Sequence, residues 1–464
     1  MLKKRMGSSA QQHVLLFPFM AKGHTIPLLQ FGRILLNRHV AVTVITTPAN
    51  RPFVEESLAG TAASVVTIPF TSTAVPGVES TDKLPSMSLF YNFALSTVSM
   101  QPHFEQALEA LPRVSFMVTD GFLWWTLQSA NIFKIRRLAF TGMSSYCMSL
   151  CRVAAVEGIF SGPQPKGELV ELTQFTWIRM CKDDVETEFR NREAETAAHE
   201  FNTKMMETTM NSYGVVENSF YELQPAFVDY LNSNSSYKTW CLGPFCLAAQ
   251  QPKKIYRVPD TKPRWIRWLD EKLEQKCSVL YVSFGSQPEV SLEQLEELAV
   301  GLEESSVSFL WVITKKNWDL PEGFEERVKS KGMVVREWVD QREILMHESM
   351  KGFLSHCGWN SVLESVCAGV PILAWPLAAD QHLNAKMVDE EIRVGLRVET
   401  SDGSLRGFVK REGLKKTVRE LMEGEKRKEA MKKVGEWACM AIKAVEEGGS
   451  SWSSLEFLLQ ETSV

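Results

Sequence analysis

The sequence predicts an α/β protein built from two doubly wound parallel sheets. Short apolar runs alternate with amphipathic helical stretches, and this alternation continues through both halves of the 464-residue chain. Many of the apolar runs are nearly continuous, as expected for parallel strands that helices cover on both faces. At roughly 100–200 residues per domain, the chain is long enough for two such units with full hydrophobic cores.

The predicted strands are short, and most of them precede a loop or an amphipathic stretch. They span residues 13–18, 40–46, 64–69, 116–119, 278–284, 309–313, 333–335, 351–354 and 370–374. The clearest helical stretches are at residues 28–37, 100–110 and 291–303. The order strand, helix, strand recurs in both halves, which favours two α/β units.

A polar stretch at residues 248–262, rich in Gln, Lys and Pro, is the predicted linker between the two units. It separates an N-terminal domain (1–247) from a C-terminal domain (263–440). The C-terminal tail (441–464) is amphipathic, and we expect it to form a helix that packs back on the N-terminal domain. The irregular stretch 158–184 is long enough to be a loop that shapes a binding site.

The composition excludes several classes of function. Lys and Arg number 51 against 56 Asp and Glu, a formal net charge of −5, so no basic excess is available for a nucleic-acid backbone. No run approaches the roughly 20 apolar residues of a membrane span. The first 20 residues lack the cleavage pattern of a signal peptide. We therefore expect a cytoplasmic protein without an integral membrane segment, and a monomer as the default.

The nine cysteines have no metal-type spacing. The pairs Cys147/Cys151 and Cys241/Cys246 lack the second pair or the histidines that would complete a zinc site, so we expect reduced thiols and no metal. The fingerprints G-x-G-x-x-G after a strand and G-x-x-x-x-G-K-[ST] are also absent, which argues against NAD-type dehydrogenases and P-loop NTPases.

A Gly-containing turn at residues 355–358 joins one predicted strand to a predicted helix over 360–368. Such a turn at a helix N-terminus is suited to bind an anion, because unpaired N–H groups and the helix dipole point outward together. The spacing of Ser361 and Glu364 also fits an S-x-x-E capping box. Spacing alone leaves capping and ligand binding equally open.

Several other polar residues lie on predicted turns after strands, where open α/β sheets bind ligands. They are His356, Trp359, Asp380 and Gln381 near the helix, and His24 and Asp120 in the first half. An imidazole with a pKa of about 6.5 suits a general base, and a carboxylate beside it fixes its tautomer. A structural histidine and a helix-capping aspartate remain open alternatives.

Residues 338–381 resemble the signature box of plant family 1 UDP-sugar-dependent glycosyltransferases, nearly residue for residue. The box opens with Trp338 and Gln341, contains the runs HCGWNS and AGVP, and closes with Asp380 and Gln381. The similarity extends from about His13 to the C-terminus, through the runs FPFMAKGHTIPLLQF and SFMVTDGFLWW. It implies two Rossmann-like domains that face each other across a cleft (GT-B type), with an N-terminal acceptor-binding domain and a C-terminal UDP-sugar-binding domain.

The resemblance implies a donor site along this box. Trp338 would stack on uracil beside the Val339 backbone and Gln341, and Glu364 would hold the ribose hydroxyls. The groups expected at the diphosphate are Ser286, His356, Asn360 and Ser361. Those expected at the sugar are Thr141, Trp359, Asp380 and Gln381. Trp359 together with Gln381 favours glucose, although the segment 377–379 departs from the commoner form of the family.

For the chemistry, the resemblance implies that His24, oriented by Asp120, removes a proton from an acceptor hydroxyl. The oxygen then attacks the sugar from the face opposite UDP, which inverts the linkage to a β-glucoside. No D-x-D metal motif occurs, so we expect no metal and no cofactor besides the UDP-sugar. A flavonoid or other phenol is the expected acceptor. Position suggests the acceptor-binding residues Phe19, Leu84, Phe122, Met143 and Phe189.

Four alternatives remain at this point. The enzyme attaches the sugar through carbon to an electron-rich phenolic ring, or it uses another UDP-sugar or a terpenoid acceptor. A catalytically idle UDP-sugar-binding protein is disfavoured by the presence of both His24 and Asp120. A nucleotide-dependent oxidoreductase is disfavoured by the missing glycine fingerprint.

Overall fold

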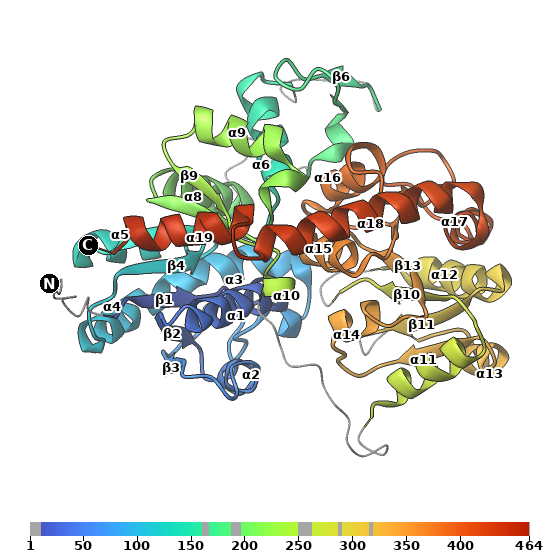
Figure 1. Ribbon diagram of the computed structural model, residues 1–464, viewed down its shortest axis with the longest axis horizontal. Coiled ribbons are helices and arrows are strands. Elements are labelled where there is room, and N and C mark those ends of the chain that lie inside the picture. Colours follow the sequence, from blue (N-terminus) through green and yellow to red (C-terminus); the bar gives the residue numbers. More distant parts are fainter. Residues whose placement is uncertain are drawn as a thin grey trace, which may run out of the picture.

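The computed structural model confirms two doubly wound α/β domains (Figure 1). It describes residues 11–159, 167–186, 196–248, 262–285, 290–314 and 319–463. Two predicted site residues, Ser286 and Phe189, lie outside the described residues, as does most of the predicted linker.

The N-terminal domain is built on a seven-stranded sheet of order β3-β2-β1-β4-β5-β8-β9, in which neighbouring strands are parallel. Its strands are β1 (His13–Phe17), β2 (Ala41–Thr46), β3 (Ser64–Thr67), β4 (Phe116–Asp120), β5 (Arg136–Thr141), β8 (Gly214–Glu217) and β9 (Lys238–Cys241). The sequence analysis missed β5, β8 and β9. Each has at most six residues and carries a charged residue at one end, so it leaves no continuous apolar run.

The C-terminal domain is built on a six-stranded parallel sheet of order β12-β11-β10-β13-β14-β15. Its strands are β10 (Val279–Ser283), β11 (Ser308–Val312), β12 (Gly332–Val335), β13 (Met350–Ser355), β14 (Ile372–Ala374) and β15 (Gly395–Arg397). All except β15, which has three residues, were predicted. A small antiparallel hairpin, β6 (Val170–Glu171) with β7 (Arg179–Met180), lies in the stretch that was predicted as an irregular loop.

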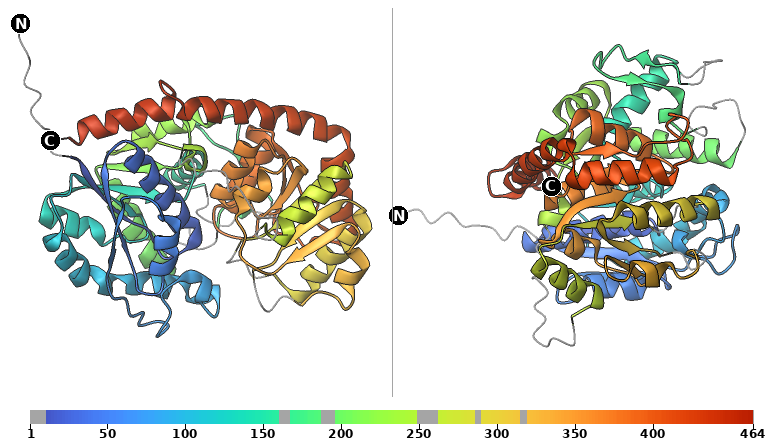
Figure 2. Two further views of the ribbon diagram at one scale, coloured as in Figure 1. Left: turned by 60° about the horizontal axis from the view of Figure 1, so that its bottom comes forward. Right: turned by 90° about the vertical axis from the view of Figure 1, so that its right-hand side faces the viewer.

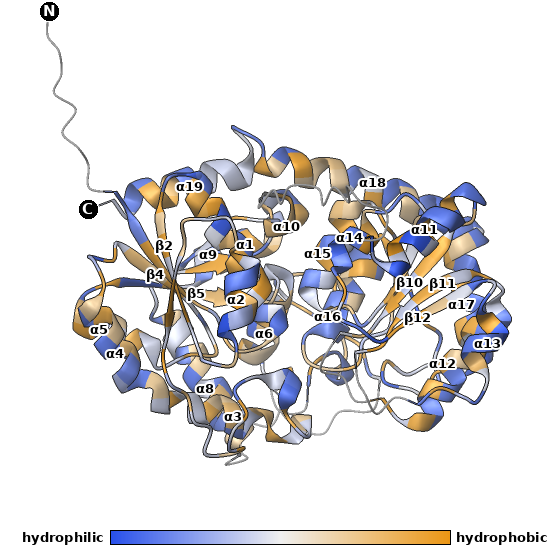
Figure 3. Cartoon of the chain, turned by 90° about the horizontal axis from the view of Figure 1, so that it is seen from below, coloured by the Kyte–Doolittle hydropathy of each residue, from blue (hydrophilic) through white to orange (hydrophobic). Residues whose placement is uncertain are grey.

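Helices cover both sheets. In the N-terminal half they are α1 (Lys22–Asn37), α2 (Arg51–Ser57), α3 (Phe90–Ser96), α4 (Gln101–Ala110), α5 (Thr126–Phe133), α6 (Ser145–Val156), α8 (Ala197–Met210), α9 (Pro225–Asn234) and α10 (Phe245–Ala248). In the C-terminal half they are α11 (Arg264–Glu274), α12 (Leu292–Ser305), α13 (Phe324–Val328), α14 (Gln341–Leu345), α15 (Trp359–Ala368), α16 (Gln381–Lys386), α17 (Arg411–Glu423), α18 (Glu425–Val445) and α19 (Ser450–Glu461). Figure 3 shows the apolar character of β10 and β11 against the hydrophilic outer helices α2 and α13.

The last two helices run along one side of both domains (Figure 2). α18 contacts α15 of the C-terminal domain and α10 at the end of the N-terminal domain, and α19 contacts β9. Leu455, Leu458 and Leu459 of α19 belong to the same buried cluster as residues of β1 and β2. The predicted boundary at residue 440 falls inside α18. The helix break lies instead at residues 446–449, where Gly448 has a φ of 85°.

Candidate active site

The carboxyl edges of the two sheets meet between the domains. The strand order reverses between β1 and β4 in one sheet and between β10 and β13 in the other. Such a reversal creates a crevice at the carboxyl edge, where open α/β sheets bind ligands. The segments that follow β1 and β13 are in direct contact, because the side-chain amide of Asn360 donates a hydrogen bond to the carbonyl of Gly23. The two crevices therefore face each other.

The carbonyl of Gly23 is free for this contact because of a proline. Gly23 lies in the first turn of α1, and its carbonyl would ordinarily accept the N–H of residue 27, which is Pro27 and has none. Asn360 Oδ1 in turn accepts a hydrogen bond from Asn218 Nδ2 at 3.2 Å. One side chain on the first turn of α15 thus holds two segments of the N-terminal domain.

His24 and Asp120 lie in contact at the reversal point of the N-terminal sheet. β1 and β4 are direct neighbours, and His24 Nδ1 lies 2.7 Å from Asp120 Oδ2. The other carboxylate oxygen, Oδ1, accepts the backbone N–H of Phe122 at 3.0 Å. The Asp120 side chain is 1% exposed and that of His24 is 19% exposed. The buried Asp120 carboxylate therefore orients the imidazole through Nδ1, and Nε2 is the nitrogen available to a substrate.

The prediction that His24 lies in a loop is wrong, since α1 begins at Lys22 and places His24 in its first turn. Helical periodicity is detected from side chains that face the core, and those of the first turn include the polar Lys22 and His24. The apolar pattern therefore starts only at residue 28, six residues after the helix does.

The net charge around His24 favours its protonated form. Burial by itself lowers the pKa of His24, but the carboxylates of Asp120 and Asp380 outweigh that effect and raise it above the usual 6.5. Burial also raises the pKa of Asp380 to about 6, despite a 2.8 Å hydrogen bond from Asn384. Asp380, at the start of α16, belongs to the other domain, so residues of both domains determine the basicity of His24.

Aromatic rings surround the His24 imidazole. Phe122 lies 4.7 Å and Phe19 5.8 Å from it between ring centroids, and these two rings lie 5.3 Å apart. Phe90 and Phe201 pack against Phe122 at 5.9 and 5.2 Å. Phe201 belongs to α8 and was not predicted, because no sequence pattern brings a helix 80 residues downstream to this position. These rings form an aromatic wall beside His24, in which Phe122 and Phe90 are partly exposed. Phe19 and Phe201 are buried, so Phe19 supports the wall and does not itself reach an acceptor as predicted.

Two further acceptor-site predictions differ in outcome. Leu84 is partly buried and packs against the same apolar cluster as Phe19. Met143 packs against a different cluster, at the domain interface. Gly142, the neighbour of Met143, lies directly beside the base, because a Cβ on it would come within 3.3 Å of the His24 ring.

The capping-box interpretation of Ser361 and Glu364 is wrong. Gly358 is the N-cap of α15, and Ser361 is the third residue of the helix. Ser361 Oγ accepts a hydrogen bond from Gln341 Nε2 at 2.9 Å, and Glu364 Oε2 accepts from the same nitrogen at 2.8 Å. Burial raises the pKa of Glu364 to about 7. The structure thus brings three predicted donor-site residues into one part-buried hydrogen-bonded network.

His356 lies in a cradle of two glycines. A Cβ on Gly285 would lie 3.1 Å, and one on Gly358 only 2.6 Å, from His356 Nε2. Burial lowers the pKa of His356 to about 4. The ring is therefore neutral near pH 7, and it can serve an anion only as a hydrogen-bond donor and not as a cation.

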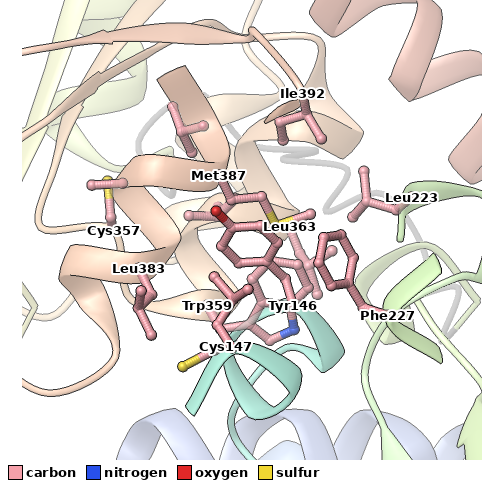
Figure 4. Packing of buried hydrophobic residues seen from close by; sticks show 14 of the residues in the cluster. Tyr146, Cys147, Leu223, Phe227, Cys357, Trp359, Leu363, Leu383, Met387 and Ile392 are labelled. Carbon is pink, nitrogen blue, oxygen red and sulfur yellow. The ribbon is translucent and has the colours of Figure 1, made fainter. Parts of the chain in front are cut away.

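Trp359 does not fit the prediction that its side chain lines the sugar. The indole is 3% exposed, and its Nε1 donates to the Asn218 carbonyl at 2.9 Å. Figure 4 shows it among Tyr146, Phe227 and Leu363, side chains from both domains. A large ring at the start of α15 is therefore part of the domain interface.

The remaining predicted donor-site residues lie around this interface. Trp338 is 59% exposed, and its ring lies 6.4 Å from Phe53 of the N-terminal domain, whereas Val339 beside it is buried. Gln381 Oε1 accepts the backbone N–H groups of Leu377 and Ala378 at 3.0 and 2.9 Å. Thr141 ends β5, one residue before Gly142, and is half-buried.

His382, next to the predicted sugar-binding residues, is a buried neutral histidine. It is 1% exposed, and neither ring nitrogen has a hydrogen-bond partner among the described residues. Burial lowers the pKa of His382 to about 3, and the positive charges of Arg406 and Arg397 act in the same direction. A histidine that stays neutral in the folded protein but gains a proton on unfolding makes the fold acid-sensitive.

The free energy of unfolding is therefore expected to fall as the pH decreases from about 6.5 toward 3. Each such histidine contributes about 1.4 kcal/mol per pH unit within its window. Unfolding of His382→Phe should take up one proton fewer than unfolding of the wild type, so the free energy of unfolding should depend less steeply on pH. Urea unfolding between pH 4.5 and 7 measures this. The exposed His103→Phe is the control. An unchanged pH slope in the His382 variant would contradict the assignment.

Within the described residues, no group of three or more His, Cys, Asp or Glu side chains is arranged to hold a metal ion. No helix of the described chain has the length and apolarity needed to cross a membrane. The nine cysteines are all described, and all are free thiols.

Comparisons with known proteins agree with this arrangement. A family model described as UDP-glucoronosyl and UDP-glucosyl transferase matches residues 273–436. The chain is 51% identical to UDP-glycosyltransferase 90A1 of Arabidopsis thaliana, over 98% of this chain and 97% of that protein. It is 35% identical to UDP-glucose flavonoid 3-O-glucosyltransferase 7 of Fragaria ananassa, over 98% and 96%.

Solved structures show the same fold. Glycyrrhiza uralensis UGT73P12, complexed with glycyrrhetinic acid 3-O-monoglucuronide, has a TM-score of 0.86 at 28% identity, over 98% of this chain and 96% of that one. Phytolacca americana UGT2, complexed with UDP-2fluoro-glucose and pterostilbene, has a TM-score of 0.82 at 28% identity, over 98% and 100%. The chain therefore belongs to the plant family 1 UDP-glycosyltransferases, enzymes that transfer a sugar from a UDP-sugar co-substrate to a small-molecule acceptor.

Proposed function

We propose that the protein transfers glucose from UDP-glucose to a hydroxyl of a small aromatic acceptor, such as a flavonoid or another phenol, and forms a β-glucoside. One observation carries the proposal: the His24–Asp120 contact lies beside an aromatic wall and close to Asp380 of the UDP-sugar domain. The base, the acceptor surface and the donor surface thus converge on one point.

The acceptor class is inferred from the wall beside the base. Phe122 is partly exposed and offers a ring to which a planar aromatic acceptor can stack, while the fully buried Phe19 packs against it. A phenol with a pKa near 10 loses its proton to an imidazole far more readily than an aliphatic alcohol does. Two relatives support the same acceptor class, since one is named as a flavonoid glucosyltransferase and the other is complexed with pterostilbene.

The proposed reaction is a single displacement at the anomeric carbon. His24 Nε2 takes the proton of the acceptor hydroxyl while the acceptor oxygen attacks opposite UDP. The bond from the sugar to the diphosphate then breaks, and the α-linked donor becomes a β-glucoside. The negative charge left on UDP is stabilised by the N-terminus of α15 and by one hydrogen bond from neutral His356.

For the donor, we assign Trp338 and the Val339 backbone to uracil, and Gln341 and Glu364 to the ribose. Both fit the exposure of the Trp338 ring and the part-buried Gln341–Glu364 hydrogen bond. The remaining proposed contacts follow the family resemblance. Those to the diphosphate are Ser286, His356, Asn360 and Ser361, and those to the sugar are Thr141, Asp380 and Gln381.

Activity is expected to depend on pH through His24. The raised pKa of His24 means that the imidazole binds a proton above pH 6.5, and a protonated imidazole cannot act as a base. kcat/KM should therefore rise with pH through an apparent pKa above 6.5. A pH profile with saturating UDP-glucose tests this, and an acid limb at or below 6.5 would refute it.

The function is tested by incubating the protein with UDP-glucose, UDP-galactose or UDP-glucuronic acid and a panel of flavonoids, simple phenols and terpenoid alcohols. Mass spectrometry detects the products, NMR gives the anomeric configuration, and each reaction is repeated with EDTA and with His24→Ala. A β-hexoside of a phenol, formed from UDP-glucose, insensitive to EDTA and lost in the variant, is the expected result. An acid-resistant product would instead indicate a carbon linkage. Products only from another UDP-sugar or only from terpenoid alcohols would overturn the donor or the acceptor assignment.

A further inference from the structure

Arg137 is a buried arginine immediately behind the His24–Asp120 pair. It is the second residue of β5, which pairs with β4, and its side chain is 1% exposed. Its guanidinium donates four hydrogen bonds. The acceptors are Thr119 Oγ1 at 2.8 Å, Thr126 Oγ1 at 3.0 Å, Ser212 Oγ at 2.6 Å and the backbone carbonyl of Asp120 at 3.3 Å.

All four acceptors are neutral groups. Within the described residues, no carboxylate oxygen forms an ion pair with Arg137, although burial of a cation without a counter-ion is costly. Neutral hydrogen bonds satisfy the donors of the guanidinium but do not neutralise its charge. The cost of burying this positive charge indicates that the charge has a role in the protein.

The negative charge that faces Arg137 is the carboxylate of Asp120. Burial lowers the pKa of Arg137 to about 10, and the attraction of Asp120 opposes that decrease, so the guanidinium stays positive near neutral pH. Asp120 thus lies between two partners, one at its carboxylate and one at its backbone. His24 binds one of its oxygens in front, and Arg137 binds the backbone carbonyl of the same residue from behind.

We propose that Arg137 is a positioning residue that acts through Asp120: it holds the backbone of Asp120 from behind, and its fixed positive charge offsets part of the negative charge beside His24, so that the imidazole is free to accept the proton of the acceptor at a lower pH. The inference rests on the proposed function, in which His24 is the base. Arg137 itself has no contact with substrate, because it is enclosed by β4, β5, α5 and the turn after α8.

The charged groups around His24 and Asp120 determine the direction in which loss of the Arg137 charge would shift the pH–activity profile. His24 comes from α1, Asp120 from β4, Arg137 from β5 and Asp380 from the start of α16. The groups contributed by α5 and by the turn after α8, Thr126 and Ser212, are uncharged. Loss of the positive charge makes the site more negative, which favours the protonated form of His24. The acid limb of the pH–activity profile should therefore move upward.

The test compares pH profiles of kcat/KM for UDP-glucose and a phenolic acceptor. Arg137→Gln removes the charge, and Arg136→Gln, one residue away on the protein surface side of β5, is its matched control. We expect the acid limb of Arg137→Gln to move upward by about one pH unit, which makes activity on that limb about tenfold lower. Arg137→Lys keeps the charge and should keep the limb near its wild-type position.

A second pair of variants tests the charge without removing Arg137. Ser212→Asp places a carboxylate where a 2.6 Å neutral acceptor now stands and so neutralises the guanidinium in place. Ser212→Asn has a similar size and no charge. Ser212→Asp should move the limb upward and Ser212→Asn should not, and this comparison remains available if Arg137→Gln does not fold.

The outcomes separate the inference from the proposed function. If His24→Ala retains activity, the assignment of the base fails. If His24→Ala is inactive but the acid limb of Ser212→Asp, and of folded Arg137→Gln, coincides with that of the wild type, Arg137 has only a structural role and the inference fails. Lower thermal stability with an unmoved acid limb would also count against the inference.

Discussion

Replacement of Asp120 by asparagine is expected to lower kcat by about 10³–10⁴-fold, with KM for both substrates within a few-fold of the wild type. Asp120 Oδ2 lies 2.7 Å from His24 Nδ1 and is the group that keeps the proton on that nitrogen. An amide at this position can present its NH2 group to Nδ1, which moves the imidazole proton to Nε2. His24 then no longer has a basic nitrogen toward the acceptor.

The measurement is steady-state kinetics with UDP-glucose and a phenolic acceptor, together with thermal unfolding to establish that the variant is folded. Asp229→Asn, on the distant helix α9, is the matched control and should retain full activity. If Asp120→Asn keeps kcat within tenfold of the wild type, the carboxylate does not orient the base.

Replacement of Glu364 by alanine is expected to have the second largest effect, a rise in KM for UDP-glucose of about 100-fold with little change in kcat. A carboxylate that accepts two ribose hydroxyls contributes hydrogen bonds of about 1.5–3 kcal/mol each, and about 3 kcal/mol corresponds to a factor of about 100 in affinity. The ribose lies away from the reacting bond, so the loss weakens the ground state and the transition state alike.

The matched variant is Glu364→Gln, which keeps the shape and one acceptor oxygen and should show an intermediate rise. Gln341 retains its 2.9 Å hydrogen bond to Ser361 in both variants, so the neighbouring network has a partner left. Affinity for UDP, measured by calorimetry, should fall in parallel with KM. A variant that loses kcat but keeps its affinity for UDP would contradict the ribose assignment.

The sequence was most informative about the donor segment, where the candidate site residues lie close together in the chain. Residues 338–381 predicted the nucleotide domain, and the structure brings Gln341, Ser361 and Glu364 of that segment into one hydrogen-bonded network. The capping box at the same positions was an equally good local interpretation. It is wrong because Gly358 begins the helix, and only the backbone path through the turn decides between the two.

Strands were predicted where their residues form an apolar run, and the strands that were missed are short and carry a charged residue at one end. β5 begins with Arg136 and Arg137, so its sequence does not indicate a core strand. In the structure Arg137 is fully enclosed behind Asp120, and Arg136 instead lies over the ring of Tyr213. Adjacent identical residues thus have opposite environments, because successive side chains of a strand point to opposite faces.

By itself the sequence determined the two parallel-sheet domains, because these depend on local periodicity. The donor segment and the candidate residues His24 and Asp120 were identified only from the resemblance of their runs to a known family. Only the tertiary structure decided which residues meet across long separations: Asn360 with Gly23, Trp359 with Asn218, and Phe201 with Phe122. Those pairs depend on how the two domains and distant helices pack. Packing is a property of whole surfaces, and no short stretch of sequence specifies it.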